Sequence, residues 1–442
     1  MKPTLDPTDP RERTLARLTE ARQRTDRLFG IVRPEALYDH PIPERHRILF
    51  YVGHLEAFDW NLLAGRVFQV DAFEPDFDRL FAFGIDPVDG RLPTDQPSDW
   101  PALAEVQRYN QGVRERLDQL LESASFSDSR KPLLQGGLIL EVAIEHRLMH
   151  AETLAYMLHQ LPPEQKIAPP ADAPLAAAPL EPRMIEIPAG SATLGVSRAS
   201  GVFGWDNEFD AHRVEVPPFA IDQFQTSNRQ FLEFVQDGGY ENRDFWSAPD
   251  WTWRTRHKID HPSFWIQRGG IWLQRTMFGE QPLPLDWPVY VSYAEASAYA
   301  RWKGLSLPTE AQWHRAAYGT TTGAERQYPW GDQPPASAYG NFDFERWDPT
   351  AVNAHPAGAS AFGVAGLVGN GWEWTTSPFD PLPGFEPFSF YPGYSADFFD
   401  GKHYVMKGGS MRTAACMLRR SFRNWFQPHY PYIYTGFRCV RT

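Results

Sequence analysis

Two histidines in one predicted helix, together with a third histidine earlier in the chain, are the residues whose spacing most directly suggests chemistry. His146 and His150 stand four residues apart in LILEVAIEHRLMHAETLAYML, whose apolar spacing predicts a helix. Side chains at this spacing project from one helix face about one turn apart, so the two imidazoles can share a metal ion. His54, in YVGHLEAFDWNLL, lies in another predicted helix and is a candidate third ligand.

Three neutral imidazoles leave coordination positions open for substrates, and this ligand type suits iron, zinc or nickel. Histidines at this spacing also occur as ordinary packing or capping residues, so the spacing alone leaves that interpretation open. Glu152 follows His150 by two residues and points about 200° away from it on a helix, which favours a supporting role over a ligand. The two cysteines, Cys416 and Cys439, are too few for a thiolate metal site.

The elements that must position these histidines are predicted to form a helical bundle. Apolar residues recur near helical spacing in four segments: Glu12–Phe29, Arg45–Phe68, Leu103–Ser123 and Leu138–Leu161. Residues 162–182 are rich in Pro and Ala and predict an extended linker. Short β-like pieces and Trp-rich loops follow over 183–442, with short helices near 228–236 and 294–303. We therefore predict a bundle domain over 1–161 and a loop-rich α+β domain over 183–442.

Composition restricts the partners of the chain. A net charge of −12 without any basic run argues against a nucleic acid bound through its phosphates. No apolar run approaches the roughly 18 residues of a membrane span, and Met1–Arg24 lacks the apolar stretch of a signal peptide. We expect a cytoplasmic protein that acts on small molecules.

The chain also resembles a known enzyme family in both of its predicted domains. His54 followed by His146, His150 and Glu152 is similar to the HxxxHxE signature of the DinB-like domain in EgtB-like ergothioneine sulfoxide synthases. The second domain carries five blocks in the order of the formylglycine-generating-enzyme fold, which is C-type-lectin-like: LSLPTEAQWHRAAYG (305–319), YPWGD (328–332), NGWEWTTSPF (370–379), KGGSMR (407–412) and TGFRCVR (435–441). The resemblance implies a DinB-like four-helix bundle followed by a formylglycine-generating-enzyme-like domain.

This resemblance also implies an activity. The family members are non-heme iron oxidoreductases that use Fe(II) and O2 to join sulfur or selenium to the imidazole C2 of hercynine, the trimethylated histidine. The metal ligands would be the three histidines already named. Asn424 and Trp425 resemble the part of the family that receives hercynine. An aromatic face suits a quaternary ammonium group, which cannot donate a hydrogen bond.

Departures from the family pattern bear on the chalcogen donor. Members that use γ-glutamylcysteine carry an acidic residue after the Asn-Trp pair and a Gln before the second histidine. Phe426 and Met149 stand at those positions, and both are candidate substrate-binding residues. Leu80–Pro87 also lacks the adjacent tyrosine pair of some members. These departures favour a SenA-like selenoneine synthase that accepts a selenosugar. The alternative is an EgtB-type ergothioneine synthase that uses cysteine or γ-glutamylcysteine, and the proton donor stays unassigned.

Other functions are compatible with parts of the same pattern. A DinB-type thiol transferase would use the three histidines for zinc or another divalent metal, but the second domain would be unexplained. A non-catalytic binding protein would keep the histidines as core residues. The copper chemistry of formylglycine-generating enzymes is disfavoured, because Thr413 and Leu418 stand where its two cysteines would be expected.

Overall fold

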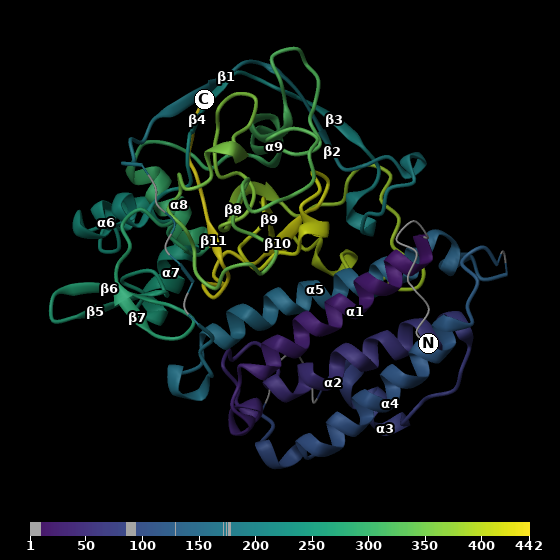
Figure 1. Cartoon of the computed structure of the whole chain (residues 1–442). Helices are drawn as coiled ribbons and strands as arrows, with labels where there is room; N and C mark the ends of the chain where they lie inside the picture. The colour runs from purple at the N-terminus through teal and green to yellow at the C-terminus, as the bar shows by residue number, and fades with distance from the viewer. Residues whose placement is uncertain (1–9, 85–93, 129, 171, 174, 176–177) are drawn as a thin grey trace. The chain divides into compact units, whose positions relative to one another are not determined.

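Residues 1–170 form one unit of the computed structural model and residues 171–442 form a second one (Figure 1). The structure describes residues 10–84, 94–128, 130–170, 172–173, 175 and 178–442. Residues 85–87 of the segment that lacks the tyrosine pair therefore lie outside the described residues.

The Pro/Ala-rich segment is divided between the two units. In the first unit, the Lys166 ammonium donates to the carbonyl oxygen of Leu158 over 3.0 Å. In the second unit, the Asn353 side chain donates to the carbonyl oxygen of Ala178 over 2.8 Å. Described parts of this segment are thus bonded to the unit in which they lie.

The first unit is a helical bundle, as the sequence predicts (Figure 1). Its helices within the described residues are α1 Pro10–Gly30, α2 Ile48–Asp59, α3 Pro75–Phe83, α4 Leu103–Glu122 and α5 Leu138–His159. α1 packs against α5, and α2 packs against α3, α4 and α5. The prediction of one helix over 45–68 was wrong in two respects: α2 begins at Ile48, and the chain continues from Trp60 to Phe68 as a π-helix.

The second unit combines short sheets with short helices, which confirms the predicted α+β class. Its helices are α6 Asn228–Gln236, α7 Ala248–His257, α8 Tyr293–Trp302 and α9 Glu310–Tyr318. Its strands are β1 Met184–Ile187, β2 Gly190–Leu194, β3 His212–Val216, β4 Phe219–Asp222, β5 Trp265–Arg268, β6 Ile271–Arg275, β7 Glu280–Pro282, β8 Trp372–Pro378, β9 Tyr404–Lys407, β10 Asn424–Phe426, β11 Thr435–Gly436 and β12 Val440–Arg441. The strand orders are β1-β4-β12, β10-β9-β8-β11, β2-β3 and β5-β6-β7, and every pairing is antiparallel except that of β11 with β8.

Polar residues cap α9 and form hydrogen bonds in the core of the second unit. Thr309 and Gln312 of the PTEAQW block form a capping box at the start of α9, as their spacing indicates. In the core, the Glu373 carboxylate accepts from the Trp313 indole over 2.9 Å and from the Arg438 guanidinium over 2.6 Å. All three side chains are fully buried, so the motif blocks build the fold's interior.

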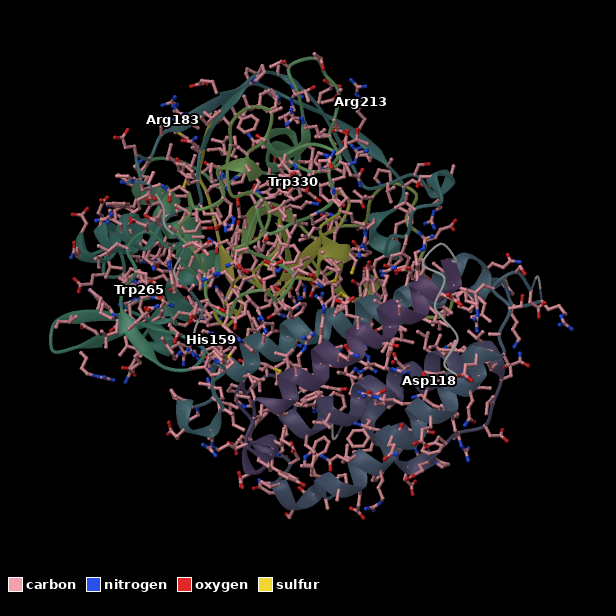
Figure 2. The ribbon with its side chains drawn as sticks, viewed as in Figure 1. Asp118, His159, Arg183, Arg213, Trp265 and Trp330 are labelled. Carbon is pink, nitrogen blue, oxygen red and sulfur yellow. The ribbon has the colours of Figure 1, made fainter. Side chains whose placement is uncertain are left out.

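Aromatic stacking orders the YPWGD block. The Trp330 ring, labelled in Figure 2, lies parallel to the rings of Tyr328 and Tyr339, and the centroids are 5.0 Å and 4.8 Å apart. Such contacts fix loops that carry little regular structure. Among the described helices, none combines the length and apolar composition that crossing a membrane requires.

Candidate metal centre

The structure brings the three histidines of the first unit together. His54 lies in the middle of α2, while His146 and His150 lie one turn apart on α5. Each offers one ring nitrogen, and these atoms all lie within 4.8 Å of one another. The ring centroids are 4.5 to 5.4 Å apart. Nitrogens bound to a single ion at about 2 Å each lie at most about 4 Å apart, so the cluster comes close to the spacing of a three-histidine metal site.

Neighbouring groups hold two of the rings in fixed orientations. Nδ1 of His54 donates to the carbonyl oxygen of Phe81 over 2.7 Å, which leaves Nε2 unprotonated and available to a metal. The Phe58 ring stacks on His146 with centroids 3.4 Å apart and planes 9° apart. Nδ1 of His150 is buried and has no hydrogen-bond partner in the described part of the chain. A buried imidazole nitrogen in that position can bind a metal ion or form a hydrogen bond with another ligand of that ion.

Burial keeps these imidazoles neutral. It lowers the pKa of His54 to about 4, and it lowers the pKa of His146 and of His150 well below the usual range. The neighbouring histidines act in the same direction on the pKa of His146 and His150. Neutral imidazole is the form that binds metals, so the donor set fits a divalent transition-metal ion.

Sequence reasoning missed the partner that orients His54. Phe81 lies in α3, which was not predicted, and it contributes a backbone carbonyl that has no sequence signature. Tyr109 and Asp78 hold this helix in place, since the Tyr109 hydroxyl donates to the Asp78 carboxylate over 2.7 Å. Glu152 is half-buried on α5 and is not part of the nitrogen cluster.

The proposed substrate residues lie in two places. Met149 is half-buried on α5, beside His150 in the first unit. Asn424, Trp425 and Phe426 form β10, an edge strand of the second unit, and all three are half-buried. Side chains alternate along a strand, so Trp425 points to one face of the sheet and its two neighbours point to the other.

Trp425 belongs to an aromatic cluster. Its ring stacks on Phe379 with centroids 4.1 Å apart and planes 8° apart. Tyr394 meets it edge-on at 5.6 Å and Phe398 lies 5.5 Å away. On the opposite face of the strand, Phe426 stacks on Tyr430 at 5.1 Å. The rings around Trp425 were not predicted individually, because Tyr394 and Phe398 come from the long connection between β8 and β9, which carries little regular structure.

Comparisons with known proteins show to which family this chain belongs. Residues 17–154 match the DinB superfamily, and residues 171–442 match the sulfatase-modifying factor enzyme 1-like domain. A hercynine oxygenase of Mycolicibacterium thermoresistibile is 34% identical over 441 residues, covering 98% of this chain and 95% of that protein. The chain belongs to the hercynine oxygenase family.

Two further relatives of the chain support the same family assignment. One from Mycolicibacterium smegmatis is 34% identical and covers 97% of this chain and 99% of its own length. Ergothioneine biosynthesis protein 1 of Neurospora crassa is 29% identical over 92% of this chain, and the match spans 55% of that protein. Family membership across both domains confirms the predicted fold and identifies a non-heme iron oxidoreductase. It also accounts for the second domain, which a DinB-type thiol transferase leaves unexplained.

Proposed function

We propose that the chain is an Fe(II)- and O2-dependent enzyme that joins sulfur to the imidazole C2 of hercynine. The observation that carries this proposal is the cluster of three neutral imidazoles in a chain of this family. His54, His146 and His150 would hold the iron. When bound, the iron supplies the one-electron chemistry that lets O2 react with closed-shell substrates.

The overall reaction balances with O2 as the oxidant. The C–H bond at the imidazole C2 and the S–H bond of the donor are broken, and one C–S bond forms. One oxygen atom of O2 becomes the sulfoxide oxygen, and the other leaves as water with the two hydrogens. The residues of the chain hold the reactants in one place, which removes the entropic cost of bringing them together.

Trp425 is proposed to receive the trimethylammonium group of hercynine. One face of its ring is covered by Phe379, so the cation would approach the opposite face, since the edge of an aromatic ring is electropositive. A cation at an aromatic face gains about 0.5 to 2 kcal/mol. The Asn424 amide oxygen accepts from the backbone N–H of Trp425 over 2.9 Å, which fixes the orientation of this amide on the other face of β10.

The donor is proposed to be a thiol, in the ergothioneine branch. The selenium branch was favoured from the sequence because Phe426 replaces an acidic residue, but the relatives named as hercynine oxygenases support the sulfur branch better. A thiosugar or selenosugar is the second candidate. The stacked rings of Phe426 and Tyr430 favour it, because a sugar ring rests well on an aromatic surface while a charged amino acid needs an ionic partner.

A competition experiment tests both parts of this proposal. The iron-loaded protein would receive hercynine, O2 and equal concentrations of cysteine, γ-glutamylcysteine and a 1-thio- or 1-selenosugar, and the adducts would be quantified by mass. A hercynine–thiol adduct carrying one extra oxygen atom is expected. A dominant sugar adduct would move the protein to the selenium or thiosugar branch. Absence of any hercynine adduct would overturn the proposed activity.

A further inference from the structure

Beside the three histidines, the first unit contains a second group of buried polar side chains. Arg147 and Asp59 are fully buried, and Glu56 is 1% exposed. The Arg147 guanidinium donates to both oxygens of Glu56, over 3.0 and 2.9 Å, and to Asp59 over 2.7 Å. A cation without polar surroundings at this depth would be strongly unfavourable, so these bonds are required once Arg147 is buried.

This group joins the two helices that carry the histidines. Arg147 follows His146 directly on α5, and Glu56 stands two residues after His54 on α2. Arg147 also donates over 3.0 Å to the carbonyl oxygen of Leu55, the residue that follows His54. The guanidinium therefore fixes α5 to α2 at the turns that present the ring nitrogens.

The same group is anchored to two other helices of the bundle, α1 and α4. Arg114 on α4 donates to Glu56 over 2.9 and 2.7 Å, and it also donates to Asp26 on α1 over 2.8 and 2.7 Å. Two arginines thus hold the Glu56 carboxylate from two sides. A carboxylate held in this way presents a fixed target to Arg147.

Stability alone does not account for such a network. Replacing buried ion pairs by well-packed apolar residues is often neutral or stabilising, whereas a planar guanidinium bonded to two acids defines one arrangement of its neighbours. Metal ligands from two helices need their relative positions held to about 0.5 Å. Apolar contacts between helices tolerate small sliding movements, and an ion-pair fork does not.

We propose that Arg147 is a positioning residue of the metal centre, which sets α2 against α5 so that the three imidazoles are arranged before the ion binds. The inference rests on the metal site of the proposed function, but not on the identity of hercynine or of the donor. It states that loss of the guanidinium weakens metal binding more than the loss of another buried arginine in the same bundle does.

The test is cobalt(II) titration of the metal-free full-length chain, followed by its visible absorption. Arg147→Met removes the bonds to Glu56 and Asp59, and Arg147→Lys keeps the charge without the planar fork. We expect cobalt affinity to fall about 10- to 100-fold in the Met variant and less in the Lys variant, with an altered visible spectrum in both. Helical content and the thermal midpoint would be measured on the same samples.

Arg22 supplies the matched control. It is buried on α1 and donates to Asp118 on α4 over 2.7 Å (Asp118 is labelled in Figure 2). In the described part of the chain it makes no hydrogen bond to α2 or α5, and it acts on Asp59 through its charge alone. Arg22→Met is expected to lower the thermal midpoint, while its cobalt affinity stays within about twofold of wild type. Large losses of metal affinity follow from changes to the groups that support metal ligands, and the hydrogen bond of Arg22 goes to Asp118 instead.

A folded Arg147→Met protein with wild-type cobalt affinity and spectrum would overturn the inference, and so would an equal loss of affinity in Arg22→Met. If Arg147→Met does not fold, wild-type cobalt affinity in Arg147→Lys would overturn it. A wild-type chain that binds no cobalt would overturn the metal site and this inference together. Normal cobalt binding without any hercynine adduct would overturn only the proposed reaction.

Discussion

Replacing Gly53 with alanine adds one methyl group at the residue before His54, and this change should disturb the metal centre. Gly53 precedes His54 on α2, and a Cβ at this position would lie 2.5 Å from Cγ, Cδ1 and Cδ2 of the Phe81 ring. Carbon atoms pack at about 3.5 Å or more, so Phe81 must retreat by about 1 Å. The clash includes Cγ, which ring rotation does not move, so the movement has to involve the Phe81 backbone or its χ1 angle.

That movement affects the hydrogen bond that orients His54. Its Nδ1 lies 2.7 Å from the Phe81 carbonyl oxygen, and a shift of about 1 Å would stretch this distance to about 3.7 Å, beyond hydrogen-bonding range. Losing a buried hydrogen bond costs about 1 to 3 kcal/mol, while alanine in a helix gains about 1 kcal/mol over glycine. We expect a net destabilisation of at most about 2 kcal/mol, but metal binding weakened about 10- to 100-fold.

The assay compares metal titration with chemical unfolding in Gly53→Ala, in Gly65→Ala and in Gly53→Ala combined with Phe81→Ala. A Cβ on Gly65 meets nothing within 4 Å, so this control should keep full metal affinity. Alanine at position 81 lacks Cγ and both Cδ atoms, so it should make room for the new methyl group and recover part of the lost metal affinity. Full metal affinity in Gly53→Ala, or equal losses in the two alanine variants, would refute the role given to the Phe81 carbonyl.

Four further predictions address the site and the second unit. His146→Ala should lose most of its iron, and full iron occupancy by metal analysis would remove the three-histidine site. Burial lowers the pKa of His54 to about 4, so between pH 6.5 and 4 the unfolded chain takes up a proton that the folded chain does not, and the metal-free protein should lose about 3 kcal/mol of stability from this residue as the pH falls. In urea unfolding across that window, the free energy of unfolding should therefore depend less steeply on pH in His54→Phe than in wild type. An unchanged pH dependence would contradict this. Glu373→Gln should destabilise the second unit by about 3 to 5 kcal/mol, because it leaves the buried Arg438 uncompensated, while cobalt binding to the first unit stays intact. Trp425→Leu should weaken hercynine binding by about 0.5 to 2 kcal/mol more than histidine binding in calorimetric titrations, and equal losses would mean that the ring only packs.

Helical periodicity predicted the bundle because its longer helices each bury a stripe of apolar residues. It failed for α3, which buries Asp78 and leaves Phe83 70% exposed, so its residue types do not mark the buried face. It also missed the change from α2 to the π-helix at Trp60, since apolar residues continue through the junction. In the second unit, the short helices predicted near 228–236 and 294–303 are present as α6 and α8.

The candidate site was predictable to the extent that it depends on side-chain type. Spacing singled out the three histidines, and the structure brings their nitrogens together. The Phe81 carbonyl had no signal, because every residue carries a carbonyl. Arg147 was equally hidden: a charged residue in a helix ordinarily indicates a solvent-facing position, and only the fold reveals that it is fully buried. The alternation along β10, which separates Trp425 from its neighbours, depends on strand pairing that three residues cannot predict.

The π-helix of the first unit has a consequence for alignment. A backbone bond from residue i to residue i+5 encloses one residue more than an α-helical bond does. A relative whose helix stays α-helical through Trp60–Phe68 would therefore need one residue fewer to reach the same point in the bundle. A gap inside a helix, where sequence alignment normally forbids one, is the correct placement here. Without that gap, every position between this segment and the next long loop would be paired with the wrong residue, and a surface lysine could be mistaken for the counterpart of a core leucine.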